Sequence, residues 1–328
     1  MDVRTLEGVR IDGLAACVPA ASVPNEEKVA KATGIVARRV AAKGETVADL
    51  CVRAAERALA DTASAPSDFG AVLCVSFTQH RRMPGVAAEA QARLGLPKGI
   101  LAFDVSLACS GWAYGLYLAG LLVRETGRKV LLLDGDVQSE FLDASDRDTA
   151  SLLSDAGTAT VLSPDAGSVP WRFAFVTDGA KGQALELKHG GTIRMDGFGV
   201  FRFVATDVVS ALKEFISQTV LSFPQSSNPP IEQSDNPPIP QSNNRTFLFV
   251  PHQPNAYMVR QLAKSVGIPE DRTALVCDEL GNMSSASVPV AIAWKGLRGP
   301  LLVAGFGGGL SISTGLIGLT SAASLSVV

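Results

Sequence analysis

The stretch Asp104-Val105-Ser106-Leu107-Ala108-Cys109-Ser110-Gly111-Trp112 joins an apolar run at 100–105 to a segment of small and aliphatic residues. The first segment is typical of a buried strand and the second of a helix. Cys109 therefore stands where a strand ends and a helix begins. The free N–H groups of a first helical turn, together with the helix dipole, favour a thiolate. We expect Cys109 to be a nucleophile whose pKa is lowered to about 3.5–7.5.

Short apolar runs alternate with helical segments along the rest of the chain, which predicts an α/β protein with buried sheets. Strands are expected at about 8–16, 70–77, 100–106, 129–135, 157–163, 169–177, 247–251, 273–277, 300–306 and 310–318. Helices are expected at about 46–61, 84–94, 110–126, 205–222, 255–266 and 284–297.

The two halves of the chain resemble each other. Cys109 and Asn282 are each followed by a small-residue helix and then by a strand, about twenty residues further on. Such a repeat suggests a duplication, with one half at 1–165 and the other at 166–328. The pattern alone leaves the alternative open, because any two strand–helix–strand units look alike.

Residues 224–245 differ from their surroundings. They are rich in Pro, Ser, Asn and Gln, and Asn-Pro-Pro-Ile occurs twice. A segment with so few apolar side chains does not pack into a core. We expect a disordered surface insertion ahead of the strand that leads to His252, although a proline-rich ligand for a partner is the alternative.

Composition excludes several classes of function. The chain has 328 residues, 47% of them hydrophobic, and a net charge of −3, which argues against nucleic acid as the main partner. The five cysteines are scattered without a C-x-x-C pair, so neither a disulfide framework nor a zinc site is predicted. No apolar run is long enough to span a membrane. We expect a cytoplasmic protein with no metal and no membrane partner.

Three further groups supply what a nucleophilic cysteine needs. His252 follows an apolar strand, at the kind of position where α/β folds place functional groups. Asn282 precedes a small-residue helix, and Gly307-Gly308-Gly309 follows a strand, where the backbone N–H of a glycine is accessible to a ligand. Each signal has a plain structural alternative: a histidine of the core, a helix N-cap and a tight turn.

Together these motifs resemble β-ketoacyl-acyl-carrier-protein synthase III, of the thiolase-fold condensing enzymes. The resemblance spans nearly the whole chain except 224–245. The matching segments are Asp104-Val105 to Cys109-Ser110-Gly111, Val250-Pro251-His252-Gln253-Pro254-Asn255, Gly281-Asn282-Met283-Ser284-Ser285-Ala286-Ser287-Val288-Pro289 and Gly305-Phe306-Gly307-Gly308-Gly309. Weaker matches lie at Thr33-Gly34-Ile35 with Arg38-Arg39, at Ser145-Asp146-Arg147 and at Ser154-Asp155-Ala156-Gly157.

The resemblance implies a five-layer αβαβα fold of two similar halves, usually a homodimer, acting without a cofactor on acyl thioesters of carrier protein or coenzyme A. Cys109 would carry the acyl group, with the N–H groups of Cys109 and Gly308 as the oxyanion hole. His252 and Asn282 would stabilise the enolate formed when a malonyl-type thioester loses carbon dioxide. The product would be a 3-oxoacyl thioester of fatty-acid or polyketide-like biosynthesis.

The resemblance also suggests residues that bind the substrate. Met83, reaching into a partner subunit, and Phe306 are expected at the acyl pocket. The expected contacts to carrier protein or pantetheine are Arg147, Arg202, Asn255, Arg260 and Lys264. The sequence departs from the family at 24–32, where the tryptophan and the arginine that hold coenzyme A are missing, which puts coenzyme A as acyl donor in doubt.

Two other functions fit the same residues. One is acyl transfer to an amine or alcohol, or a condensation without decarboxylation. The other is a silent partner subunit of a heterodimeric synthase. The presence of Asn282 favours carbon–carbon bond formation, and the intact trio of Cys109, His252 and Asn282 argues against a silent subunit.

Overall fold

The computed structural model describes residues 1–219 and 247–328. The predicted insertion at 224–245 therefore lies outside the described residues. No helix in the described part of the chain is long and apolar enough to cross a membrane.

Two large sheets dominate the described residues. The six-stranded sheet has the order β15 (Ser324–Val327), β2 (Val9–Cys17), β8 (Ala156–Pro164), β7 (Lys129–Asp136), β5 (Phe69–Val75) and β6 (Leu101–Val105). The five-stranded sheet has the order β1 (Arg4–Leu6), β9 (Trp171–Thr177), β14 (Ser311–Leu319), β13 (Gly299–Gly307) and β12 (Leu248–Pro251). Both contain the same motif, in which two parallel strands adjoin two antiparallel ones: β5, β7, β8, β2 and β12, β13, β14, β9.

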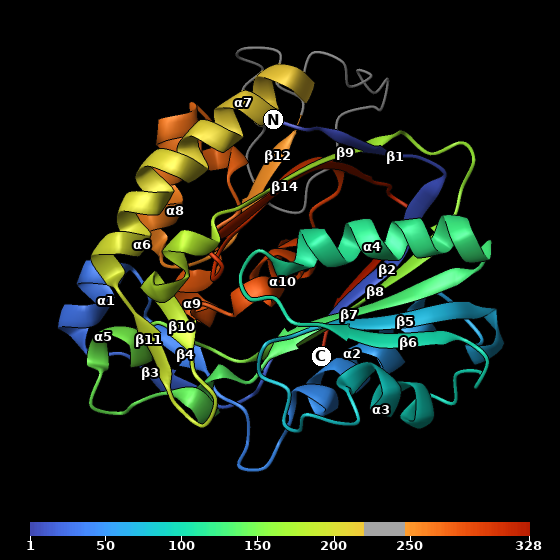
Figure 1. Cartoon of the computed structure of the whole chain (residues 1–328), viewed down its shortest axis with the longest axis horizontal. Coiled ribbons are helices and arrows are strands. Elements are labelled where there is room, and N and C mark those ends of the chain that lie inside the picture. Colours follow the sequence, from blue (N-terminus) through green and yellow to red (C-terminus); the bar gives the residue numbers. More distant parts are fainter. Residues whose placement is uncertain (220–246) are drawn as a thin grey trace.

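Helices lie between the sheets and on both outer faces, so the predicted five-layer arrangement is confirmed (Figure 1). The central layer holds α4 (Gly111–Thr126) and α10 (Ser287–Lys295). One outer layer holds α2 (Val47–Asp61) and α3 (Val86–Arg93), against the six-stranded sheet. The other holds α7 (Val209–Thr219) and α8 (Ala256–Val266), against the five-stranded sheet.

The strands are apolar on both faces because both faces are covered. In β7, Val130 and Leu132 pack into the central layer, whereas Leu131 and Leu133 pack under α2 and α3. The central helix α4 approaches its neighbours closely. A Cβ added to Gly120 would lie 2.3 Å from a methyl carbon of Leu6, which explains the small residues in this helix.

The predicted division at residue 165 falls between β8 of the six-stranded sheet and β9 of the five-stranded sheet. The two chain ends are exceptions. β1 pairs with β9 in the second sheet, and β15 pairs with β2 in the first. Each sheet is therefore completed by a short strand from the opposite end of the chain.

Short elements gather on one side, at the left of Figure 1, and most of them were not predicted. They are β3 (Ser22–Pro24), α1 (Glu27–Thr33), β4 (Ala37–Arg39), α5 (Arg147–Ala150), β10 (Leu185–Leu187), β11 (Ile193–Met195), α6 (Gly197–Phe203) and α9 (Cys277–Leu280). β10 and β11 form an antiparallel hairpin. The helix expected from residue 205 begins earlier, as α6, and continues through a π-helical turn at Val204–Val208 into α7.

The strand predicted at 273–277 is wrong. Its backbone makes one bridge, from Thr273 to Phe249, and the chain then turns into α9. The side chain of Gln253 makes the backbone hydrogen bonds that a neighbouring strand would otherwise make. It donates to the carbonyl of Ala274 at 3.0 Å and accepts the N–H of Val276 at 3.0 Å. An apolar run is buried here without sheet pairing because one amide side chain satisfies its backbone.

Candidate active site

Cys109 lies at the start of the central helix, one residue before Ser110, which occupies the N-cap position of α4. Its side chain is 9% exposed and lines a cavity of about 340 Å³. Asn282 and Gly308 line the same cavity. Residues far apart in the sequence thus meet at the point where strand β6 leads into the central layer.

The glycine-rich turn between β13 and β14 lies directly against Cys109. A Cβ added to Gly307, whose φ is +152°, would lie 3.1 Å from Sγ of Cys109. A hydroxyl chain holds the turn in place: Ser311 donates to the carbonyl of Gly308 at 2.8 Å and pairs with Ser110 at 2.7 Å. The turn needs glycine because the thiol occupies the space that a side chain would fill.

Burial determines the protonation of Cys109. It raises the pKa of the thiol to about 12, although the side chain of Ser284 and the N–H groups of Cys109 and Gly308 act to lower it. The pKa expected from the helix start is therefore wrong for the free protein, because desolvation outweighs the N–H donors. The thiol is protonated at neutral pH and needs a proton acceptor when it reacts.

His252 follows β12 at the end of its parallel pairing with β13. Its backbone N–H donates to the carbonyl of Ala304 at 2.6 Å. Its ring packs edge to face against Phe306, with the ring centroids 5.4 Å apart. The side chain is 2% exposed, and the backbone of Ser284 interacts with the ring, although Nδ1 has no well-aligned hydrogen-bond partner among the described residues. Burial lowers the pKa of His252 to about 3, so the ring is neutral at physiological pH.

Asn282 is fixed by its backbone and its side chain. Its carbonyl accepts the N–H of Ser154 at 2.8 Å and Nε2 of Gln138 at 2.9 Å. Its side-chain oxygen accepts the N–H of Ser284 at 3.0 Å. The amide nitrogen remains as a donor beside the cavity. Asn282 is not the N-cap of the turn that follows, since that position is taken by Met283, and its role as a hydrogen-bond donor to a substrate stays a prediction.

The arrangement offers a thiol, two backbone N–H groups next to it and a neutral donor on each of two nearby segments. Such donors stabilise an oxyanion or an enolate without bringing a buried charge of their own. Among the described residues, no group of three or more His, Cys, Asp or Glu side chains is placed to hold a metal ion.

The sequence analysis missed most of the cavity wall. One side is the β10–β11 hairpin, which contributes Leu185, Glu186, Leu187, Ile193 and Met195. The remaining wall residues are Phe77, Ser106, Leu107, Ala108, Gln138, Thr149, Leu153 and Gly309. The hairpin did leave a signal, because Leu185 and Leu187 alternate with Glu186 ahead of the turn glycines Gly190 and Gly191.

The two residues predicted at the acyl pocket are not among those that line this cavity. Phe306 is buried and packs edge to face against the ring of His252. Met83 is 83% exposed on the surface of the chain. Its expected place in the pocket of a partner subunit stays a prediction.

The residues predicted to contact carrier protein or pantetheine lie around the site rather than in it. Arg147, on α5, pairs with Glu26 at 3.3 Å, and Arg202 is exposed on α6. The side-chain oxygen of Asn255 caps α8 by accepting the N–H of Met258 at 2.8 Å. Of these residues, Arg147 lies on the same short helix as Thr149, which lines the cavity.

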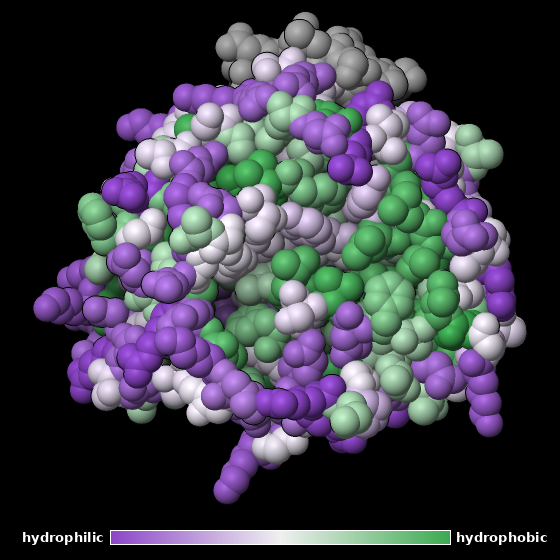
Figure 2. Space-filling view, in the orientation of Figure 1, coloured by the Kyte–Doolittle hydropathy of each residue, from purple (hydrophilic) through white to green (hydrophobic). Residues whose placement is uncertain are grey.

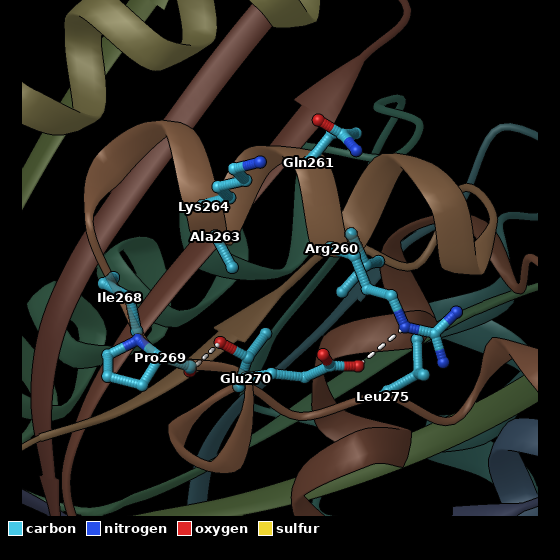
Figure 3. Close-up of a pocket in the computed structure, with 10 residues that line it drawn as sticks. Arg260, Gln261, Ala263, Lys264, Ile268, Pro269, Glu270 and Leu275 are labelled. Carbon is cyan, nitrogen blue, oxygen red and sulfur yellow. Dashed lines mark hydrogen bonds and ion pairs between the residues drawn. The ribbon is translucent and has the colours of Figure 1, made fainter.

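Arg260 and Lys264 lie in a separate groove beside α8, with a volume of about 330 Å³ (Figure 3). In this close-up the guanidinium of Arg260 points to Glu270, and the two are 2.7 Å apart. None of the residues that line this groove also lines the cavity of Cys109. A role for these two cations would therefore be in docking a partner and not in holding the reacting group.

Comparison with known proteins gives the same family as the sequence motifs. Residues 103–179 match the family model for 3-oxoacyl-[acyl-carrier-protein] synthase III, and residues 244–319 match the model for its C-terminal part. The chain is 30% identical to the β-ketoacyl-[acyl-carrier-protein] synthase III of Syntrophomonas wolfei over 310 residues, which cover 88% of this chain and 87% of the relative.

Solved structures agree over nearly the full length. The 3-oxoacyl-(acyl-carrier protein) synthase from Burkholderia xenovorans LB400 superposes with a TM-score of 0.86 at 27% identity, covering 99% of both chains. The priming β-ketosynthase of the R1128 polyketide biosynthetic pathway superposes with a TM-score of 0.79 at 26% identity, covering 97% of this chain and 98% of the other. With the fold and the sequence identity in agreement, the chain belongs to the 3-oxoacyl-[acyl-carrier-protein] synthase III family.

Proposed function

We propose that the protein forms a carbon–carbon bond by decarboxylative Claisen condensation, giving a 3-oxoacyl thioester in fatty-acid or polyketide-like biosynthesis. The observation that carries the proposal is the cavity that Cys109, Asn282 and Gly308 line together. His252 is buried at the end of β12, the strand that pairs with β13. The family comparisons support the same reaction, since the relatives are named as synthases of this type.

In the first half-reaction, the sulfur of Cys109 attacks the carbonyl carbon of an acyl thioester. The carbonyl oxygen becomes an oxyanion. It accepts hydrogen bonds from the backbone N–H groups of Cys109 and Gly308, which face the thiol. The carbon–sulfur bond of the donor then breaks, the donor thiol leaves with a proton, and the acyl group stays on Cys109. Each well-placed donor of this kind contributes about 10²–10³ in rate.

In the second half-reaction, a malonyl-type thioester loses its carboxylate as carbon dioxide, and the electron pair forms an enolate. The amide nitrogen of Asn282 and the neutral ring of His252 donate hydrogen bonds to the enolate oxygen. The enolate carbon attacks the carbonyl of acyl-Cys109, and the sulfur of Cys109 leaves. A neutral His252 suits this role because it donates without a buried charge that the site would have to solvate.

The substrates bring their own activated acyl groups, so the reaction proposed needs no cofactor. An acyl carrier protein is the proposed partner, and exposed cations such as Arg147 and Arg202 are available to an acidic carrier. The acyl donor is also proposed to come from a carrier protein, because the segment 24–32 lacks the tryptophan and arginine associated with coenzyme A. A cytoplasmic location fits these partners and the five free thiols.

We also propose a homodimer formed through the free edge of the six-stranded sheet. β6 pairs on one side with β5 and presents its other side outward, with Leu101 48% and Phe103 39% exposed. Hydrophobic residues gather over α4 and the neighbouring strands, right of centre in Figure 2. An unpaired edge beside an apolar surface favours pairing with a second copy.

Intact-mass spectrometry tests the reaction. The protein is incubated with acyl-carrier and acyl-CoA thioesters, and an acyl adduct is expected on the native chain and not on Cys109→Ala. Addition of malonyl carrier protein should then release carbon dioxide and a 3-oxoacyl product. Adducts that pass to an amine or alcohol and yield no carbon–carbon bond would contradict the condensation, and no adduct from any donor would contradict the enzyme.

A further inference from the structure

A buried polar cluster lies next to Cys109. It is formed by Asp136 at the end of β7 and by Ser284, in the 3₁₀ turn Ser284–Ala286 that leads into α10. Both residues are fully buried, and neither lines the cavity. The proposed condensation does not use them.

One oxygen of Asp136 is saturated and the other is not. Oδ1 accepts hydrogen bonds from the hydroxyls of Ser76 at 3.0 Å and Thr78 at 2.9 Å. It also accepts hydrogen bonds from the backbone N–H groups of Phe77 at 3.0 Å and Thr78 at 3.2 Å. Oδ2 is buried and has no hydrogen-bond partner of full geometry among the described residues. An acceptor left open inside a core is costly, which points to a use for it.

Ser284 is the residue that connects Cys109 with Asp136. Its side chain interacts with Cys109 on one side and with Asp136 on the other, while its own Oγ is buried without a well-aligned partner. Its backbone is in the left-handed region, with a φ of +53°. A serine held in this strained conformation next to a reacting atom indicates a function for its hydroxyl.

We propose that Ser284 and Asp136 form a proton relay that takes the proton of the Cys109 thiol during acylation. The S–H bond breaks as Ser284 Oγ accepts the proton, and the hydroxyl hydrogen of Ser284 passes to Oδ2 of Asp136. The negative charge moves from the carboxylate to the sulfur, and the hydroxyl then donates to the thiolate. The inference rests on the proposed role of Cys109 as nucleophile.

The relay resolves the problem of a buried thiol. Burial raises the pKa of Asp136 to about 7, so the carboxyl can hold a proton near neutrality. The cluster carries one negative charge before and after the transfer, so no new charge is buried. The other titratable groups nearby are Asp134, whose pKa burial raises well above its usual range, and His252, which is neutral.

Alkylation of Cys109 by iodoacetamide tests the relay, because it reports the thiolate without any acyl substrate. In the native protein the logarithm of the alkylation rate should rise up to about pH 7, where Asp136 ionises, and then level off. In Asp136→Asn the thiol titrates alone, so the rate should rise steadily through pH 7 without levelling. A native profile without this inflection, or an Asp136→Asn profile that keeps it, would overturn the relay.

Ser284→Gly and Ser284→Ala test the hydroxyl, and the glycine variant suits the positive φ. Both should lower the plateau rate roughly 10–100-fold, the effect of one hydrogen bond to a charged group. The matched control is Ser285→Ala, which removes the neighbouring buried hydroxyl that donates to Asp134 and should keep the native profile. An unchanged plateau in both Ser284 variants would refute the relay, whereas absent acylation with the native alkylation profile would refute only the proposed function.

Discussion

The side-chain oxygen of Asn282 accepts the backbone N–H of Ser284 at 3.0 Å, and this bond determines which end of the amide is free to serve the cavity. Because the oxygen is occupied, the amide nitrogen is the group that remains to donate to a substrate. The same short segment thus orients Asn282 and places the Ser284 side chain next to Cys109.

Asn282→Asp should separate the two half-reactions. The aspartate keeps an acceptor for the N–H of Ser284, but it offers no donor and repels an enolate. We expect acyl-Cys109 to form, with condensation slowed by about 10²–10³-fold. Mass spectrometry measures the first step and release of carbon dioxide the second. A normal condensation rate in this variant would rule out the enolate role.

His252 should make the fold less stable in acid. The unfolded ring binds a proton below about pH 6.5, whereas the folded ring resists protonation down to about 3. Stability from this group is therefore lost as the pH falls from 6.5 towards 3, by up to about 1.4 kcal/mol per pH unit. Asp136 acts in the opposite direction, because its folded pKa of about 7 lies above the usual value.

The contribution of His252 is isolated by comparing the native protein with His252→Gln in denaturant titrations at several pH values. The difference between the two unfolding free energies should shrink as the pH falls below 6.5. A difference that stays constant from pH 7 to pH 4.5 would show that the ring is not held neutral.

Gly307→Ala should slow acylation about 100-fold. The added Cβ would lie 2.9 Å from Cβ and 3.1 Å from Sγ of Cys109, so the thiol must move. A displacement of about 1 Å costs about 10²-fold in rate. Gly296→Ala is the control, since Gly296 also has a positive φ but nothing lies within 4 Å of its added Cβ. Equal effects on acylation would assign the loss to backbone strain alone.

Ile193→Trp should shorten the acyl chain that the enzyme accepts. Ile193 is 4% exposed and lines the cavity on the β10–β11 hairpin, so a larger ring reduces the space beside Cys109. We expect kcat/KM to fall for long acyl donors and to change little for acetyl donors, measured as adduct formation. An equal fall in kcat/KM for acyl donors of every length would show that the hairpin does not limit the length of the acyl chain.

Phe103→Glu should weaken the proposed dimer. Phe103 is 39% exposed on the free edge strand β6, where a carboxylate would be buried against a second copy at a cost of several kcal/mol. Light scattering after size-exclusion chromatography should show monomer. Val169→Glu is the control, because Val169 is 40% exposed in the turn between β8 and β9. A dimer that survives Phe103→Glu would place the interface elsewhere.

Much of the fold could be predicted because the large strands are buried on both faces and keep an unbroken apolar pattern. β7 and β13 are examples, with both faces of each packed under helices. The prediction at 273–277 failed because an equally apolar segment is held by the side chain of Gln253. The three-residue strands β10 and β11 were too short for their alternation to be recognised.

The sequence by itself determined the α/β class and the positions of Cys109, His252 and Asn282, because each follows a strand or starts a helix in a local context that the neighbouring residues define. The tertiary structure decided how those residues behave. Burial by segments from both halves makes the thiol and the imidazole neutral. Packing between elements far apart in the chain also brings Ser284 and Asp136 together next to Cys109, and the same packing causes the desolvation.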